Sequence, residues 1–323
     1  MTDPNLTAVW QRAGQHLQRL AREPAYRVQI EKQLYAGAPA ALRAEIQRSG
    51  PAPRPLQGEI RPLDFAGEPE LAAMQRLAMA LATEKTAALL AAYDRHPATG
   101  GGRYVCSDSF KELFPAWAEP AQRARANDAL HNSSAVLAAT QLAALLERGE
   151  PRLALFLTGI PGAGKTTLSR ALLDDERVGL MFEGQLARPQ SAFPKITACL
   201  DRGWSVAILA VHRSPETALA NTLKRFHAYG RGGSLAVMSA IQGHLPAGLA
   251  ELRAHFGGRI RLLALDGDTG DFIDDPAAIE ARLNLGAPET IRRRLETRLD
   301  ALWQSGALSP AARAQALHTH LKL

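Results

Sequence analysis

Apolar positions in the first 95 residues recur at helical spacing. Three- and four-residue steps separate one set, and we expect it to form a single helix face: Leu71, Met74, Leu77 and Leu81, with Leu89 and Leu90 further on. A weaker pattern of the same kind runs through Trp10, Leu17 and Leu20. The prolines of Gly50–Pro55 exclude helical dihedrals and remove backbone donors, so this stretch predicts a linker between two helical pieces.

The pattern changes after the glycine-rich break Thr99–Gly102. A helical stretch at 119–148 stops at Gly149, which we expect to cap it. Short apolar runs of strand length otherwise alternate with helical segments: Arg103–Cys106, Leu153–Leu157, Val178–Phe182, Val206–Val211 and Ile260–Leu265. This alternation predicts an α/β fold with a parallel sheet and helices on both faces. We therefore divide the chain into a helical N-terminal extension, 1–98, and an α/β domain, 99–323.

Composition narrows the class of protein without selecting a function. The 323 residues are 46% hydrophobic and 22% charged, as in ordinary globular proteins. No apolar run approaches the roughly 18 residues that span a membrane, and no secretory signal opens the chain, so we expect a cytoplasmic protein. Two cysteines cannot form a disulfide framework or a zinc site. A net charge of +6 is compatible with a nucleotide ligand as well as with a nucleic acid. Because the basic residues have few aromatic residues near them, the composition does not require a nucleic-acid partner.

One stretch predicts a phosphate-binding loop. Gly159-Ile160-Pro161-Gly162-Ala163-Gly164-Lys165-Thr166 fits the Walker A pattern, with an apolar strand before it and a helix from Thr167 after it. Glycines let backbone N–H groups approach phosphate oxygens, and the helix presents its positive end to the same phosphates. We expect the whole segment to bind ATP or GTP, with Lys165 on the β- and γ-phosphates and the Thr166 hydroxyl on Mg²⁺. The fold is then that of a P-loop NTPase.

Missing motifs narrow the kind of P-loop protein. The chain has neither the Asn-Lys-x-Asp segment of GTPases nor the Leu-Ser-Gly-Gly signature of ABC ATPases. A small-molecule or nucleic-acid kinase remains, in which an acid takes a proton from the acceptor hydroxyl.

Several segments resemble zeta toxins. The resemblance covers about 103–270 and rests on the Walker A motif and on these blocks: Phe182-Glu183-Gly184-Gln185-Leu186, Phe193-Pro194-Lys195, Gly203-Trp204-Ser205-Val206 and Arg213-Ser214-Pro215-Glu216. The segment from Thr222 through Arg225 to Arg231 is similar to the arginine-bearing lid of that family. The resemblance implies an ATP- and Mg²⁺-dependent kinase that phosphorylates a sugar hydroxyl of UDP-N-acetylglucosamine.

The order of the strands departs from that family. The Asp-x-Phe-[Arg/Lys] pattern that ends the strand of the catalytic aspartate follows the Walker helix in zeta toxins. Its match here, Asp108-Ser109-Phe110-Lys111, precedes the Walker strand. A parallel sheet accepts a strand from either side of the chain if the crossover is right-handed. We therefore expect the strand before Asp108 to join the same sheet in a rearranged order.

Each candidate site residue has a functional and a structural interpretation. Asp108 is the candidate general base, or it caps the helix that begins near Ser109. Glu183 is the second acid: it resembles the glutamate of zeta toxins that contacts substrate or Mg²⁺, or it is a strand-end glutamate exposed to water, and it becomes the base if Asp108 lies far away. Arg225 and Arg231 stabilise the transferring phosphoryl group from a glycine-hinged lid, or they are solvated.

Further positions give weaker signals. Lys111 either holds a substrate phosphate or lies on the surface, and His131 either faces the substrate or is structural. His212 follows a strand and is a weak candidate for the pocket. Asp266 and Asp268 end the last expected strand, where they either contact adenine or form a plain turn.

Three functions remain open. The first is a kinase acting on a nucleotide sugar, and the second is a kinase of the same architecture acting on a nucleoside, an antibiotic or a nucleic-acid hydroxyl. The third is a nucleotide-dependent switch protein that does not transfer phosphate. Zeta toxins are silenced by a small helical antitoxin, so residues 1–98 either inhibit the nucleotide site within the chain or serve packing and oligomerisation. A separate antitoxin is the other expected partner.

Overall fold

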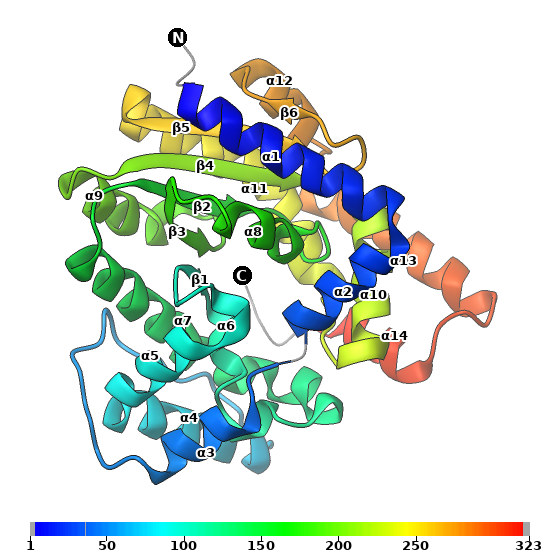
Figure 1. Cartoon of the computed structure of the whole chain (residues 1–323). Helices are drawn as coiled ribbons and strands as arrows, with labels where there is room; N and C mark the ends of the chain where they lie inside the picture. Colours follow the sequence, from blue (N-terminus) through cyan, green and yellow to red (C-terminus); the bar gives the residue numbers. More distant parts are fainter. Residues whose placement is uncertain (1–3, 36, 319–323) are drawn as a thin grey trace.

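A six-stranded sheet forms the centre of the molecule (Figure 1). The computed structural model describes residues 4–35 and 37–318. The sheet has the order β1-β3-β2-β4-β5-β6. Its strands are β1 (Tyr104–Cys106), β2 (Leu153–Thr158), β3 (Val178–Glu183), β4 (Ser205–His212), β5 (Ile260–Asp266) and β6 (Phe272–Ile273). The five expected strands are confirmed, and β6 is an addition that the sequence pattern did not predict.

The shared direction of the strands places the candidate site residues at one edge of the sheet. β1 to β5 pair in parallel, and only β6 runs antiparallel among the described strands. β1 joins the sheet beside β3, with Cys106 opposite Glu183, as expected for a strand that precedes the Walker strand. The carboxyl ends of β1, β2 and β3 therefore lead into Asp108, the phosphate loop and Glu183 at the same edge.

Side chains of the strands alternate between two apolar cores. Leu153, Leu155 and Leu157 of β2 join one cluster, whereas Ala154 and Phe156 join the other. Both faces of the sheet are covered by helices, so each strand is apolar at nearly every position. The predicted α/β class is confirmed.

The helices follow the expected alternation after the sheet begins. Their bounds are α6 (Ser107–Lys111), α7 (Pro120–Arg148), α8 (Lys165–Leu173), α9 (Phe193–Asp201), α10 (Pro215–Tyr229), α11 (Leu235–Phe256), α12 (Pro276–Leu283), α13 (Pro288–Gln304) and α14 (Pro310–Leu317). α7 and α9 contribute to the core that contains Phe156, and α8, α10 and α13 contribute to the core that contains Leu155.

In the described part of the chain, five α-helices precede the sheet and pack in two places. They are α1 (Pro4–Arg22), α2 (Pro24–Tyr35), α3 (Ala40–Arg48), α4 (Pro69–Glu84) and α5 (Thr86–Arg95), and a helix-free segment separates α3 from α4. α1 and α2 lie against α8, whereas α3, α4 and α5 gather around α7 at the opposite end of the molecule (Figure 1). The apolar cluster of α3 to α5 is continuous with the core under the sheet.

One local expectation about the helices is wrong, and another is confirmed. Leu77 is 50% exposed, because the buried face of α4 runs through Leu71, Ala78 and Ala82, and Leu77 lies outside it. Gly149 is the C-cap of α7, as expected, and its backbone is extended (φ −95°). A Cβ at Gly149 would lie 2.8 Å from the carbonyl oxygen of Leu145, so close packing explains the glycine.

No helix in the described part of the chain is both long and apolar enough to cross a membrane.

Candidate active site

The phosphate loop connects β2 to α8 at the carboxyl edge of the sheet. Gly159 has φ 137°, and a Cβ there would lie 2.3 Å from the carbonyl oxygen of Val211. Gly162 has φ 84°, and a Cβ there would lie 2.2 Å from the carbonyl oxygen of Ala218. Both positions therefore require glycine, because neighbouring backbone occupies the space of a side chain. The Walker A segment is held in a fixed shape by β4 and α10.

Most residues expected to bind nucleotide line one cleft with a volume of about 900 Å³. From the loop and its helix these are Gly159, Pro161, Gly162, Gly164, Lys165, Thr166 and Thr167. Ile160 and Ala163 belong to the same segment, but both are buried in the apolar core. Their side chains anchor the loop, so only their backbone is left to face a phosphate.

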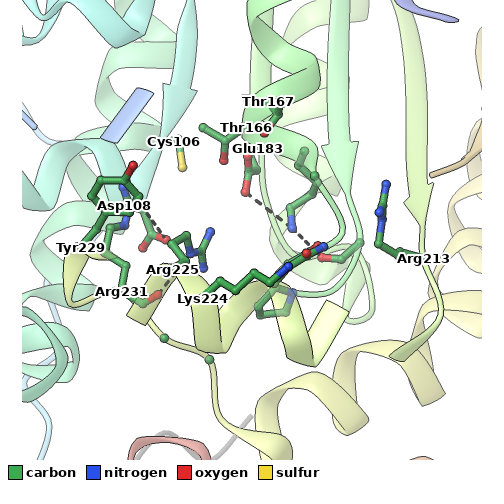
Figure 2. Close-up of a pocket in the computed structure, with 18 of the residues that line it drawn as sticks. Cys106, Asp108, Thr166, Thr167, Glu183, Arg213, Lys224, Arg225, Tyr229 and Arg231 are labelled. Carbon is green, nitrogen blue, oxygen red and sulfur yellow. Dashed lines mark hydrogen bonds and ion pairs between the residues drawn. The ribbon is translucent and has the colours of Figure 1, made fainter. Parts of the chain in front are cut away.

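The structure brings the remaining predicted site residues into the same cleft. The lining includes Asp108, Lys111, His131, Glu183, Arg225 and Arg231. Figure 2 shows Asp108, Arg225 and Arg231 on one side of the pocket and Arg213 at the other, with Thr166 and Glu183 between them. The cleft is therefore long, with the phosphate loop near its middle.

Glu183 lies between the phosphate loop and β1. Its Oε1 is 3.7 Å from Nζ of Lys165, which also donates to the carbonyl oxygens of Gly159 (2.9 Å) and Ile160 (3.0 Å). Its Oε2 accepts a 2.5 Å hydrogen bond from the hydroxyl of Tyr104. Burial, and then the neighbouring Cys106 and Glu183, raise the pKa of Tyr104 well above its usual range. The phenol thus stays protonated and orients Glu183.

Asp108 contacts two cations and does not cap its helix. No side-chain hydrogen bond caps α6. The Oδ1 atom of Asp108 accepts from Nζ of Lys111 at 2.8 Å, and Oδ2 is 3.5 Å from Nη2 of Arg231. Burial raises the pKa of Asp108, but the charges of Lys111 and Arg231 outweigh it and hold the pKa well below the usual range. With 44% of its side chain exposed, Asp108 is an ionised carboxylate open to the cleft.

The expected lid, Thr222 to Arg231, consists of the C-terminal part of α10 and the two residues that follow this helix. Gly230 ends α10 with φ 68°, and a Cβ there would lie 1.9 Å from the carbonyl oxygen of Pro120. Arg231 is only 9% exposed and pairs with Glu112 at 3.0 Å, so it is not a solvated arginine. Arg225 is half-buried, and its Nε donates to the carbonyl oxygen of Arg231 at 3.2 Å. Both arginines therefore project from this corner into the cleft near Asp108 (Figure 2).

Lys111 is buried and is not a surface lysine. Its side chain is 2% exposed, and Nζ also donates to Oδ1 of Asn127 at 2.7 Å. Asn127 in turn donates to Asp128, which contacts His318 at 3.2 Å. Asn127 and Asp128 of α7 thus form a polar network that holds Lys111 beside Asp108.

His131 and Cys106 are uncharged at neutral pH. Burial, and then the charge of Lys111, lower the pKa of His131 to about 4. Burial raises the pKa of Cys106 to about 12, so its thiol is not a nucleophile. Neither residue adds charge to the lining of the cleft.

The far end of the cleft is formed by Arg213 and the turn after β5. Asp266 is buried there, accepts the N–H of Asp268 at 2.8 Å and pairs with Arg282 at 3.0 Å. These contacts fit the turn interpretation of Asp266, whereas Asp268 lines the cleft. His212 is buried and does not line the cleft. Side chains of α1 and α2 also reach this cleft: Leu17, Gln18, Leu20, Arg22, Arg27 and Glu31.

The donor atoms fit a magnesium nucleotide. Carboxylate and hydroxyl oxygens of Glu183 and Thr166 border the loop, and Mg²⁺ prefers oxygen ligands together with substrate phosphates. Among the described residues, no group of three or more His, Cys, Asp or Glu could hold a metal ion.

Sequence reasoning missed several residues that shape the site. Tyr104 orients Glu183, and Glu112 pairs with Arg231. Arg123 donates to the carbonyl oxygens of Trp117 (3.0 Å) and Tyr229 (3.0 Å), which ties α7 to the end of α10. Only the position of Glu112, one residue after Lys111, could have drawn attention to it in the sequence.

Comparisons with known proteins give limited information. No protein-family model and no curated protein matches the chain. Among solved structures, it is similar to one from the PezAT chromosomal toxin–antitoxin system of the human pathogen Streptococcus pneumoniae. The sequence identity is 16% and the TM-score 0.37, and the match covers 62% of this chain and 74% of that chain. A likeness at this level carries no argument about function. The resemblance to zeta toxins stays with the motifs of the P-loop, the Glu183 strand and the Arg225–Arg231 segment.

Proposed function

We propose that the protein is an ATP-dependent kinase that transfers the γ-phosphoryl group to a hydroxyl of a nucleotide sugar, as zeta toxins do. One observation carries the proposal: an ionised, half-exposed carboxylate, Asp108, shares a single cleft with a complete phosphate loop. Arg225 and Arg231 project into the same side of that cleft, where positive charge stabilises a transferring phosphoryl group.

The reaction follows from this arrangement. The acceptor hydroxyl oxygen forms a bond to the γ-phosphorus while the bond between that phosphorus and the β–γ bridging oxygen breaks, and ADP leaves. The hydroxyl proton passes to a carboxylate oxygen of Asp108. Because the pKa of Asp108 is low, the carboxylate first orients the hydroxyl and accepts the proton late, which suits a loose phosphoryl transition state.

Residues of the loop would hold the nucleotide. Lys165 and the backbone N–H groups of Gly162 and Gly164 would contact its phosphates, and Thr166 with Glu183 would hold Mg²⁺. The metal neutralises charge on the β- and γ-phosphate oxygens when it is bound. Tyr104 keeps Glu183 in place for this role.

The experiment that tests the proposal is an acceptor screen. The full-length protein is incubated with ATP, Mg²⁺ and a panel containing nucleotide sugars, nucleosides and 5′-hydroxyl oligonucleotides, and each acceptor is examined by mass spectrometry. We expect one added phosphate on UDP-N-acetylglucosamine or a related sugar nucleotide. A phosphate on another acceptor would support the second kind of kinase. ATP binding without any transfer would support a switch protein.

We further propose that residues 1–98 regulate this cleft. Leu17 and Leu20 of α1 and Arg27 of α2 line it together with Lys165. Nε2 of His16 lies 3.3 Å from the carbonyl oxygen of Thr167, so α1 is fixed to the helix of the phosphate loop. Through these contacts α1 and α2 would restrict access of nucleotide, the role that a separate antitoxin plays for zeta toxins.

A further inference from the structure

Two buried polar residues, Glu112 and His96, form a chain of contacts that ends at Arg231. Nη1 of Arg231 donates to Oε1 of Glu112 at 3.0 Å, and its Nη2 is 3.5 Å from Oδ2 of Asp108. Glu112 is only 4% exposed. The guanidinium thus lies between two carboxylates, with the closer contact to the one that does not face the cleft.

The second oxygen of Glu112 is held by His96, which is 2% exposed. Nδ1 of His96 accepts the backbone N–H of Ala98 at 3.1 Å, so this nitrogen carries no proton. The ring proton of neutral His96 is therefore on Nε2, which donates to Oε2 of Glu112 at 2.6 Å. The backbone N–H of Ala98 thus determines the tautomer of His96, and this tautomer holds the carboxylate of Glu112 in place.

Glu112 consequently meets a donor at each oxygen. An ionised carboxylate accepts both hydrogen bonds without a proton of its own, and its negative charge faces Arg231 in a site largely closed to water. A carboxamide would offer one acceptor oxygen and would turn an N–H group toward one of the two donors. The arrangement therefore selects glutamate and not glutamine.

The segment that carries Arg231 does not fix its side chain alone. Gly230, Gly232 and Gly233 surround Arg231, and glycines permit many backbone conformations. Without Glu112 the guanidinium loses the closer of its two carboxylate partners and no longer keeps its position beside Asp108. A displaced guanidinium stabilises the transferring phosphoryl group less well.

We propose that Glu112, oriented by His96, is a positioning residue that holds the guanidinium of Arg231 beside Asp108 during phosphoryl transfer. The inference rests on the proposed kinase function. Its anchor, His96, lies in the segment before the sheet, so the helical N-terminal part of the chain contributes to the geometry of the site. Glu112 itself does not touch the reacting atoms.

The test compares Glu112→Gln with Glu45→Gln in the full-length protein. Glu45 also pairs with an arginine, Arg95 at 2.7 Å, but both side chains are about half exposed and lie outside the cleft. We expect Glu112→Gln to lower kcat by about 10- to 100-fold, as the loss of one charge-assisted hydrogen bond does, with the KM for ATP within about twofold of wild type. Glu45→Gln leaves both constants unchanged.

Limited trypsin digestion gives a readout that does not depend on activity. Trypsin cleaves after an arginine whose side chain can leave the protein, and Arg231 is buried and paired with Glu112. We expect Glu112→Gln, and not Glu45→Gln, to speed cleavage after Arg231 severalfold. Where Glu112→Gln does not fold, Glu112→Asp keeps the charge but withdraws it by one methylene, and the same two effects follow at a smaller size.

The possible outcomes distinguish a failure of the positioning role of Glu112 from a failure of the proposed kinase function. An active wild type whose Glu112 variant keeps its kcat, or keeps its cleavage rate after Arg231, overturns the positioning role alone. A wild type that phosphorylates no acceptor overturns the proposed function, and the positioning role with it.

Discussion

The hydroxyl of Tyr104 offers a single-atom test of the site. Tyr104 is fully buried on β1, and its hydroxyl donates to Glu183 at 2.5 Å. Tyr104→Phe removes the oxygen and keeps the ring, so it leaves no large cavity. Oε2 of Glu183 then loses its donor, whereas Oε1 keeps its 3.7 Å contact with Lys165. The substitution removes the hydrogen bond to Glu183 together with the contact of the same hydroxyl with Thr166, and leaves the packing of the ring unchanged.

The magnitude follows from the charge on the acceptor. A hydrogen bond to a charged group contributes about 1.5–3 kcal/mol, and removal of one partner from a buried pair costs a similar amount. Because some water can reach Glu183, we expect Tyr104→Phe to lower the free energy of unfolding by about 2 kcal/mol. With an m-value of about 2–3 kcal/mol/M, the urea midpoint falls by about 0.7–1 M.

The assay is urea unfolding, together with the rate of phosphate transfer. Tyr26→Phe is the matched control, because the Tyr26 hydroxyl lies 3.0 Å from the ring nitrogen of His16, outside the Glu183 network. We expect this control to lose about 1 kcal/mol or less of the free energy of unfolding. If Tyr104→Phe unfolds at the wild-type midpoint and transfers phosphate at the wild-type rate, Tyr104 does not orient Glu183 and this reasoning is refuted.

Three further outcomes are expected. Gly162→Ala should abolish ATP binding in calorimetry, because its Cβ would lie 2.2 Å from a backbone oxygen, whereas Gly101→Ala, also at positive φ but in open space, should bind normally. Folding lowers the pKa of His131 from 6.5 to about 4, so below about pH 6.5 the unfolded chain binds a proton that the folded chain does not, and the free energy of unfolding falls. Wild type should therefore lose about 2 kcal/mol more than His131→Gln between pH 7 and pH 5, measured by urea unfolding, and an equal loss would contradict the shift. Trp10→Ala, which loosens α1 from the sheet core, should raise ATP affinity severalfold in calorimetry. An unchanged or weaker affinity would mean that α1 only braces the phosphate loop.

Local signals in the sequence predicted the sheet and the phosphate loop. Runs such as Leu153–Leu157 are apolar at every position, which is typical of parallel strands buried on both faces. The glycines of the Walker segment appear in the structure where neighbouring backbone leaves no space for a Cβ. The strand before Asp108 joins the sheet beside β3, as the resemblance and the handedness of crossovers led us to expect.

Contacts between distant parts of the chain could not be predicted in this way. The bond from Tyr104 to Glu183 spans 79 positions and that from Arg231 to Glu112 spans 119, so no local spacing signals either of them. Leu77 illustrates the opposite error, because it fits the helical period but lies off the face that α4 buries. Which face of a helix is buried depends on the helices around it, and the period alone does not determine this.

The central claim is that Asp108 accepts the proton of an alcohol while the phosphate loop holds ATP. The most direct measurement is the rate of phosphate transfer to the acceptor by wild type and by Asp108→Asn, with ATP affinity measured for both. The account predicts a fall in rate of at least about 100-fold, since a general base contributes about 10²- to 10⁴-fold, with ATP affinity nearly unchanged. Transfer by Asp108→Asn at the wild-type rate would contradict it.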